Sequence, residues 1–225
     1  YLSRMRFIGN KELINSEIKK ILEEHGLANK GLTLFDAFCG TGAISDFLKD
    51  SFNLFANDML KWCVIYTRGR ICGKTCTFEK LGYDPFLFFN GNSKKVKGFF
   101  YKQYSPGGSK RMYFSKNNAG RIDYFRTTIE NWKEENRINE NEYSFLLASL
   151  IESVSTISNT AGVYGAFLKH WDPRALKPIE FKKVEYKNSF HINVEFNNSK
   201  IEDIVSDIDC DILYLDPPYT QNQYG

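Results

Sequence analysis

The chain has 225 residues, 42% of them hydrophobic, which suits one sizeable core or a core domain with a smaller second domain. Its net charge of +3 is too small to indicate a charged ligand. The sequence lacks both an apolar run of about 18 residues and a signal region, and its five cysteines lack zinc-site spacing, so we expect a cytoplasmic protein with reduced thiols, no membrane partner and no metal.

The first 71 residues alternate between helical and strand patterns. Apolar residues recur at helical spacing over 12–24, and apolar runs of strand length follow at 32–38 and 53–58. Each run leads into a stretch that predicts a helix, 43–49 and 59–71 respectively. A series of strand, helix, strand and helix is typical of a parallel sheet with α/β connections.

The character of the chain changes near Cys72. Between Gly73 and Arg121 there are ten basic and two acidic residues, so the rest of the chain is acidic overall. This asymmetry predicts that the basic stretch meets a polyanion. Its many aromatic residues are expected mainly to form the core of a small subdomain, which two helices at 122–135 and 141–159 continue.

The α/β pattern returns late, with candidate strands at 191–196 and 211–216. We therefore predict a Rossmann-like α/β domain formed by residues 1–72 and 191–225. A mostly helical insertion, residues 73–190, interrupts it.

A glycine turn follows the first predicted strand, in the segment Asp36–Gly42. A dinucleotide site would place a third glycine where Ser45 stands, and the Gly-Lys-Ser/Thr of a phosphate loop is absent. Asp36 would repel a pyrophosphate but suits an ammonium group, and Asp58 ends the next strand where it could accept hydrogen bonds from ribose hydroxyls. Ammonium, ribose and a nearby sulfonium together describe S-adenosylmethionine. The alternative is a tight turn with a helix cap.

The second motif is Asp216-Pro217-Pro218-Tyr219, directly after an apolar strand. Two prolines fix the backbone and remove two N–H donors, which leaves a stiff turn that offers carbonyl acceptors. The exocyclic amine of a base is a poor nucleophile. Hydrogen bonds to Asp216 and the Pro217 carbonyl would favour a pyramidal nitrogen, and Tyr219 would stack on the base. The alternative is a structural turn at a strand end.

Together, the Asp-Pro-Pro-Tyr motif and the upstream Phe-x-Gly-x-Gly resemble the Dam-like, or D12, class of adenine-N6 DNA methyltransferases. The segment 6–11 looks like the N-terminal motif of that class, and 113–123 and 141–169 are similar to its type II restriction–modification branch. The resemblance covers nearly the whole chain. It implies methyl transfer from S-adenosylmethionine to N6 of a flipped adenine in duplex DNA, as part of a restriction–modification system.

The resemblance also implies roles for individual residues. Asp216, Pro217, Pro218 and Tyr219 would be catalytic and hold the adenine. Asn197 or Asn198 would neighbour the cofactor's adenine; the alternative is that they only form a solvated turn. The residues expected to bind the cofactor are Phe7, Lys11, Asp36, Phe38, Gly40, Gly42 and Asp58. Relatives carry a target-recognition region between the two motifs. The DNA-binding residues expected there are Lys110, Arg111, Tyr113, Lys116 and Lys169, with 105–111 as a mobile DNA-contacting loop.

A complete methyltransferase sheet of this class has about seven strands, and this sequence supplies about four. We therefore expect a fold truncated after the catalytic strand, with 211–216 at an uncovered edge that a missing C-terminal segment or a second chain completes. Two alternatives remain open. One is an RNA or cytosine-N4 methyltransferase, against which Asp216 weighs because related motifs there more often begin with Asn or Ser. The other is a truncated, non-catalytic fragment that binds only DNA or cofactor.

Overall fold

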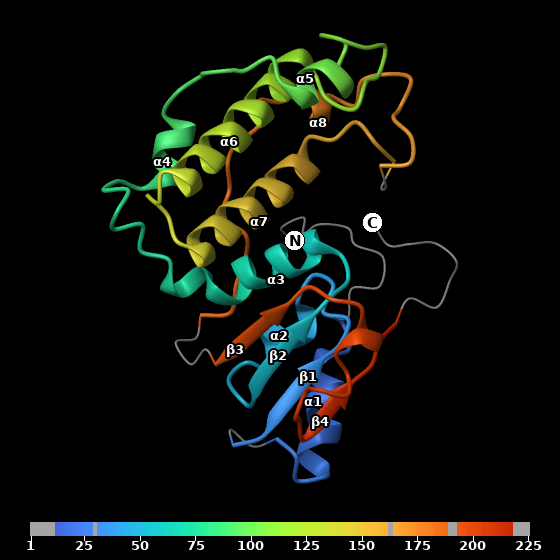
Figure 1. Ribbon diagram of the computed structural model, residues 1–225. Helices are drawn as coiled ribbons and strands as arrows, with labels where there is room; N and C mark the ends of the chain where they lie inside the picture. The colour runs from blue at the N-terminus through green and yellow to red at the C-terminus, as the bar shows by residue number, and fades with distance from the viewer. Residues whose placement is uncertain (1–11, 29–30, 162–163, 189–192, 218–225) are drawn as a thin grey trace. The chain divides into compact units, whose positions relative to one another are not determined.

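The computed structural model describes residues 12–28, 31–161, 164–188 and 193–217 (Figure 1). The chain divides into two compact units. One, the sheet unit, holds the described residues up to Cys76 and those from Glu185 onward; the other, the helical unit, is Thr77–Val184. Within the described ranges, no helix combines the length and the apolar character needed to cross a membrane.

The sheet unit alternates between helices and strands, which confirms the predicted α/β fold with a parallel sheet. In chain order its elements are α1 (Asn15–Glu24), β1 (Thr33–Asp36), α2 (Ala43–Leu48), β2 (Asn53–Asn57), α3 (Lys61–Cys72), the short 3-10 helix η1 (Gly73–Thr75), β3 (Val194–Asn197), the 3-10 helix η2 (Ile201–Asp203) and β4 (Ile212–Tyr214). The four strands form one parallel sheet in the order β3-β2-β1-β4.

The strand order changes direction at β1. The chain adds β2 and then β3 on one side of β1, and later adds β4 on the other side. Asp36, at the end of β1, is in register with Ala56 of β2 and with Tyr214 of β4. In open parallel sheets, ligands bind beyond the carboxyl ends of the strands at such a change of direction. The residues that follow β1 and β4 therefore leave the sheet side by side, at the edge where sheets of this kind bind ligands.

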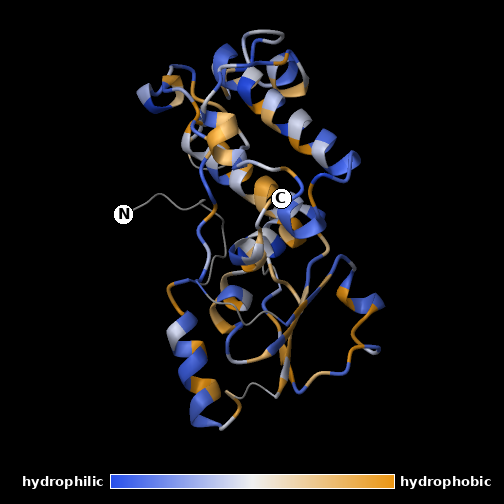
Figure 2. Ribbon diagram, turned by 90° about the vertical axis from the view of Figure 1, so that its left-hand side faces the viewer, coloured by the Kyte–Doolittle hydropathy of each residue, from blue (hydrophilic) through white to orange (hydrophobic). Residues whose placement is uncertain are grey.

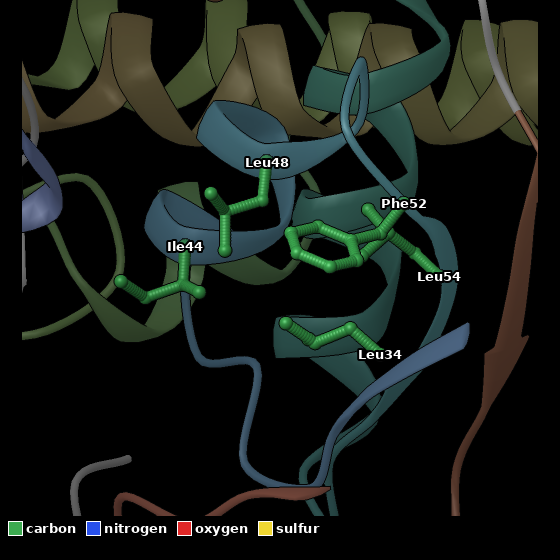
Figure 3. Close-up of a cluster of buried hydrophobic side chains, with 5 residues drawn as sticks. All are labelled: Leu34, Ile44, Leu48, Phe52 and Leu54. Carbon is green, nitrogen blue, oxygen red and sulfur yellow. The ribbon is translucent and has the colours of Figure 1, made fainter. Parts of the chain in front are cut away.

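A cluster of buried side chains joins α2 to the sheet (Figure 3). Its members come from β1, α2, the loop before β2 and β2 itself, and they are Leu34, Ile44, Leu48, Phe52 and Leu54. Helix α1 carries both hydrophilic and hydrophobic residues (Figure 2), and its hydrophobic residues Ile18 and Leu22 pack against the cluster. Each fully buried aliphatic or aromatic side chain contributes about 1.5–3 kcal/mol, and this cluster anchors the strand that carries Asp36.

The helical unit is built around aromatic side chains, as the composition of the insertion predicts. Its helices are α4 (Pro85–Asn90), α5 (Phe99–Gln103), α6 (Lys116–Glu134), α7 (Glu140–Thr156) and α8 (Pro173–Leu176). The ring of Phe89 lies 4.7 Å from that of Phe181 and 5.0 Å from that of Phe125, measured between ring centres. Phe78, Phe86 and Phe114 are also buried. The helices α4 and α5 lie in the part of the insertion where the sequence shows little periodicity.

Helix α6 begins six residues earlier than the predicted start at Ile122. Ser115 caps it, because the Ser115 hydroxyl accepts a hydrogen bond from the backbone N–H of Asn118 at 3.2 Å. The buried Asn118 amide donates to the carbonyls of Ala175 and Lys177. Tertiary contacts of a polar side chain thus stabilise a first turn whose Lys-Asn-Asn-Ala-Gly sequence is a poor helix former.

Helix α7 ends at Thr156, three residues before the predicted end at Asn159. The buried Asn159 side chain explains the early end. Its amide nitrogen donates to the carbonyls of Met112, Leu168 and His170, and its oxygen accepts the N–H of Asp172. An asparagine that satisfies backbone groups of two other segments, at 112 and at 168–172, lies outside the helix.

Candidate active site

The glycine turn after β1 has a backbone that only glycine adopts easily. Gly40 has a φ of 51° and Gly42 a φ of 69°. A Cβ atom added at Gly42 would lie 2.8 Å from a side-chain carbon of Thr67 in α3. The Thr67 hydroxyl in turn donates to the Gly40 carbonyl at 3.1 Å. Helix α3 therefore presses against the turn and fixes its shape.

Asp58 ties the same turn to the end of β2. One carboxylate oxygen, Oδ2, accepts the backbone N–H of Gly40 at 3.0 Å, and Oδ1 accepts the N–H of Leu60 at 2.9 Å. Burial raises the pKa of Asp58, and these two backbone hydrogen bonds oppose the rise. The backbone N–H of Cys39 also donates to the Asn57 carbonyl at 2.8 Å. The turn is thus held from β2 at two consecutive positions.

Asp36 is the most deeply buried carboxylate of this edge. Its Oδ2 atom accepts a hydrogen bond from the Ser45 hydroxyl at 2.6 Å, whereas its buried Oδ1 atom has no hydrogen-bond partner among the described residues. Burial raises the pKa of Asp36 from 3.8 to about 7; hydrogen bonding from Ser45 and from the Phe38 backbone opposes this, and the negative charges of Asp58 and Asp216 add to it. A buried carboxylate with an unsatisfied oxygen favours a cationic N–H donor as its ligand.

Asp216 lies two residues beyond Tyr214, which is in register with Asp36. Its charge is close enough to raise the pKa of Asp36, so the glycine turn and the start of the Asp-Pro-Pro-Tyr motif share one electrostatic environment. Asp216 is half-buried and Pro217 exposed. Four predicted site residues lie outside the described residues, namely Phe7, Lys11, Pro218 and Tyr219.

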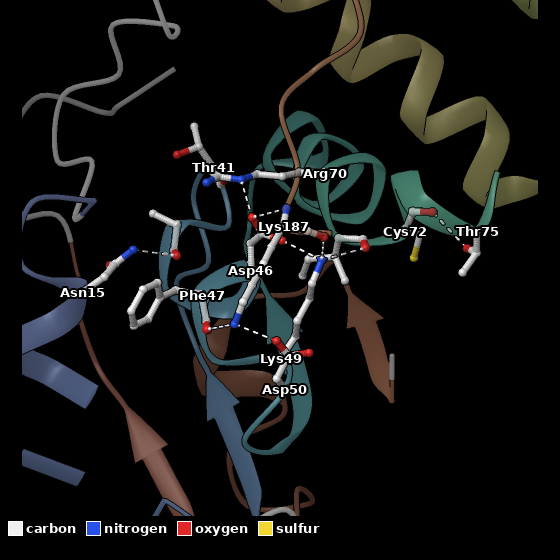
Figure 4. Close-up of polar contacts among 12 residues, drawn as sticks. Asn15, Thr41, Asp46, Phe47, Lys49, Asp50, Arg70, Cys72, Thr75 and Lys187 are labelled. Carbon is white, nitrogen blue, oxygen red and sulfur yellow. Dashed lines mark hydrogen bonds and ion pairs between the residues drawn. The ribbon is translucent and has the colours of Figure 1, made fainter. Parts of the chain in front are cut away.

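Behind the turn, the structure contains a buried cluster of charges that the sequence analysis does not anticipate (Figure 4). Asp46 in α2 pairs with Lys49 at 2.8 Å and with Arg70 of α3 at 3.1 Å. The Arg70 guanidinium also lies 3.4 Å from the Thr41 carbonyl of the turn, to which it donates. Asp46 further accepts the backbone N–H of Lys187 at 3.3 Å. One buried carboxylate thus joins α2, α3, the turn and the returning chain.

Two asparagines at the ends of β2 and β3 complete the edge. The buried Asn57 side chain donates to the carbonyls of Ala37 and Ser199, and it accepts the backbone N–H of Ser199. The Asn198 amide donates to the carbonyls of Asp58 and Met59, at 2.8 and 3.0 Å. Asn198 therefore orients the segment that contains Asp58, and its expected contact with the cofactor's adenine stays a prediction.

All five predicted DNA-binding residues lie in the helical unit. Lys110, Arg111, Lys116 and Lys169 are exposed, and Tyr113 is half-buried, with its hydroxyl donating to the Tyr164 carbonyl at 3.2 Å. The preceding loop is folded onto itself: the buried Ser105 hydroxyl donates to the Tyr101 carbonyl at 2.7 Å and accepts the N–H of Gly107 at 3.1 Å. Ser109 and Gly108 also donate to the Ser105 carbonyl.

Sequence reasoning missed Thr67 and the cluster of Asp46, Lys49 and Arg70. Their side-chain partners are 22 or more residues away in the chain, apart from the Asp46–Lys49 pair. The available signal was the occurrence of Asp46 in a mostly apolar helix and of Lys49 directly after it, because buried charges need partners.

Comparison with known proteins agrees with this geometry. The family described as D12 class N6 adenine-specific DNA methyltransferase matches residues 7–225. The chain is 37% identical to the type II methyltransferase M.FokI of Planomicrobium okeanokoites, over 98% of the chain and 35% of that relative. It is also 37% identical to the modification methylase StsI of Streptococcus sanguinis, over 98% of the chain and 34% of that relative.

A shorter relative, the type II methyltransferase M.CviAII of Paramecium bursaria Chlorella virus 1, is 32% identical over all of the chain and 67% of its own length. The chain spans about a third of the length of M.FokI and StsI. No solved structure matches it significantly. The family match over nearly all residues, with the glycine turn and Asp216 at one sheet edge, leads to one conclusion: the chain belongs to the D12 class of N6 adenine-specific DNA methyltransferases.

Proposed function

We propose that this chain binds S-adenosylmethionine beyond the ends of β1 and β2 and methylates N6 of adenine in duplex DNA. The observation that carries the proposal is the register of β1 with β4, which brings Asp36 and Asp216 to one edge of the sheet. We further propose that it acts in the cytoplasm as the modification half of a restriction–modification system, as the names of its relatives suggest.

The residues of the turn fit this cofactor. The buried, unpartnered Oδ1 of Asp36 would accept a hydrogen bond from the ammonium group of its methionine part. Gly40 and Gly42 leave the turn without side chains, so a ligand can approach its backbone. The backbone N–H groups of Gly40 and Leu60 each donate to one oxygen of Asp58. Each oxygen has a second lone pair, which could accept a hydrogen bond from a ribose hydroxyl. Phe38 lies in the turn itself, and we assign Phe7 and Lys11 to the same pocket.

When bound, S-adenosylmethionine supplies a methyl carbon on a positively charged sulfur, which an amine nitrogen can take up while the sulfur keeps the bonding electrons. The protein's part is to prepare that amine. Asp216 and the Pro217 carbonyl would accept its N–H groups, which makes the nitrogen lone pair available, and Asp216 can take the proton that the nitrogen loses. Pro218 would stiffen the turn and Tyr219 would stack on the flipped adenine.

We assign recognition of the DNA to the helical unit. Its basic residues would neutralise phosphates, and the five expected contacts are Lys110, Arg111, Tyr113, Lys116 and Lys169. We also propose that another polypeptide segment pairs with β4. This strand lies at the edge of the described sheet, and Leu213 and Leu215 are 42% and 57% exposed.

Transfer of tritiated methyl groups from S-adenosylmethionine to unmethylated mixed-sequence duplex DNA tests the proposal. The wild-type chain should label duplex DNA but neither RNA nor a reaction without nucleic acid. Asp216→Ala should abolish labelling and leave cofactor binding, measured by calorimetry, largely intact. Asp207→Ala, which removes an exposed carboxylate of the same unit, is the matched control and should label DNA like the wild type.

Each other outcome has a defined meaning. Labelling of RNA instead of DNA would replace the proposed substrate. Binding of cofactor or DNA with no labelling at all would identify a non-catalytic binding chain. Equal loss of labelling and cofactor binding in Asp216→Ala would assign the turn a structural role.

A further inference from the structure

Helix α5 is rich in aromatic residues but buries none of its residues. It contains Phe99, Phe100 and Tyr101, and Tyr104 directly follows its last residue. Phe99 is 61% exposed, although its ring has neighbours in Phe100 and Tyr104, at 5.7 and 5.5 Å between ring centres. A phenylalanine ring held outward in this way leaves a flat apolar face available for stacking on a ligand.

Asp123 of α6 fixes the first turn of α5 through hydrogen bonds. The Asp123 carboxylate accepts the backbone N–H groups of Gly98, Phe100 and Tyr101, at 3.0, 2.9 and 2.8 Å. A Cβ atom at Gly98 would lie 2.8 Å from the same carboxylate, so the residue before Phe99 has no room for a side chain. The position of Phe99 is therefore set by buried contacts and not by its own ring.

The loop of residues 105–109, which contains Gly107 and Gly108, also packs against α5. A Cβ atom at Gly107 would lie 2.4 Å from the Tyr101 ring, and one at Gly108 would lie 2.6 Å from the Lys102 backbone. The loop thus packs directly against α5, and α5 and the loop form one small platform. The predicted contacts Lys110 and Arg111 follow at the end of this loop.

Apart from the buried Asp123, the charged residues that the platform and its flanking segments carry are basic. No acidic residue occurs from Lys94 to Ile122. The exposed basic residues in this stretch are Lys94, Lys95, Lys97, Lys102, Lys110, Arg111 and Lys116. Lys97 lies 5.8 Å from the Tyr101 ring centre and Arg111 lies 5.8 Å from that of Tyr104, so cations and rings are interleaved. A second copy of this surface would be repelled, whereas DNA offers both phosphates and flat bases.

We propose that Phe99 stacks on a base of the DNA substrate while Lys97, Lys102 and Arg111 contact the neighbouring phosphates. The proposal rests on the DNA methyltransferase function proposed above. An enzyme that takes an adenine out of the duplex disrupts the base stack, which exposes the faces of bases to a ring of this kind. A flat ring and a row of cations supply the two interactions that such an opened duplex needs.

Binding of the full chain to a fluorescein-labelled, mixed-sequence duplex tests this inference, measured by fluorescence anisotropy at several salt concentrations. Phe99→Ala should weaken binding about tenfold, since stacking of one base contributes roughly this much. Phe99→Trp, which keeps a flat ring, should bind within about threefold of the wild type. Leu87→Ala removes another exposed apolar side chain of the same unit, 74% exposed, and should change nothing.

The salt dependence separates stacking from charge. Phe99→Ala should lower affinity equally at all salt concentrations, whereas Lys102→Ala should reduce the slope of log affinity against log salt by about one. Thermal unfolding midpoints should be equal in all variants, because Phe99, Lys102 and Leu87 are all exposed.

Wild-type affinity in Phe99→Ala would overturn the inference, as would a change in oligomeric state without a change in DNA affinity. Methyl transfer to DNA, assayed in parallel, tests the proposed function separately. If binding depends on Phe99 but no methyl group is transferred, the stacking role of Phe99 is supported and the proposed methyltransferase activity is refuted. If DNA is methylated but neither binding nor methylation changes in Phe99→Ala, the activity is supported and the stacking role is refuted. A chain that neither binds nor methylates DNA would refute both proposals.

Discussion

The carboxylate of Asp58 accepts a hydrogen bond from the backbone N–H of Gly40, 3.0 Å away, across 18 residues of sequence. This contact joins the end of β2 to the glycine turn after β1. It means that Asp58 has two tasks in the proposed cofactor site, because the same side chain holds the turn and faces the proposed position of the ribose. Its loss should therefore affect cofactor binding more than an ordinary surface carboxylate would.

Replacing Asp58 with alanine should weaken S-adenosylmethionine binding by about 10- to 100-fold, the range expected when a hydrogen bond to a charged group is lost. Isothermal calorimetry measures the effect, and circular dichroism checks that the fold is retained. Asp207→Ala serves as the control because Asp207 is an exposed carboxylate of the same unit. If Asp58→Ala binds the cofactor as tightly as this control, Asp58 has no part in the site.

Gly42→Ala should destabilise the chain by about 2–4 kcal/mol, because alanine disfavours a φ of 69° and its Cβ would meet Thr67 at 2.8 Å. Gly26 provides a matched control with the same φ and open space around it, so Gly26→Ala should cost only about 1–2 kcal/mol. Urea denaturation measures both. Equal losses would mean that α3 does not press on the turn.

The raised pKa of Asp36 predicts an unusual pH dependence of stability. Between its ordinary value of 3.8 and its folded value of about 7, the folded chain holds a proton that the unfolded chain has released. The contribution of Asp36 to stability is thus full below pH 4 and is lost as the pH rises through 7. Asp36→Asn, which stays neutral, should lack this slope and become the more stable chain near pH 8.

Urea denaturation from pH 4 to 8 compares the two chains. Their difference should be small at pH 4 and at most about 4 kcal/mol at pH 8. Saturating S-adenosylmethionine should flatten the wild-type slope, since its ammonium group would favour the charged carboxylate. Parallel curves for wild type and Asp36→Asn would show that Asp36 titrates normally.

The buried pairs of Asp46 predict a large loss of stability when that carboxylate is removed. Asp46→Ala leaves Lys49, which is fully buried, and Arg70 without their common partner, and this should cost about 3–5 kcal/mol. Asp50 pairs with Lys187 at 2.7 Å in a more exposed position, so Asp50→Ala should cost less than about 1 kcal/mol. Similar losses in urea denaturation for the two variants would contradict the central role of Asp46.

The elements of the sheet unit could be predicted from the sequence because their signals are local. The apolar run that ends at Asp36 and the glycines that follow it belong to one continuous segment, as do β4 and Asp216. Parallel pairing then follows from the alternation of strands and helices, and it brings the two segments to one edge.

The contacts that hold this edge in place could not be predicted in the same way. Thr67, Arg70 and Asn198 each act on backbone groups far away in the sequence, so their roles depend on the packing of α3 and β3. The early start of α6 and the early end of α7 have the same origin. Asn118 and Asn159 have low helix propensity, and their tertiary hydrogen bonds decide whether each joins the helix.

The pairing of β1 with β4 also bears on how such a chain can diverge. The ladder between Asp36 and Tyr214 is made of backbone hydrogen bonds, which are indifferent to the length of the polypeptide that connects the two strands. Doubling that connection costs only about 0.6 kcal/mol in closure entropy. The stretch between α3 and β3 can therefore become longer or shorter at little cost to the pairing of β1 with β4. On the function proposed above, DNA recognition could change in this way while the edge that holds Asp36 and Asp216 is retained.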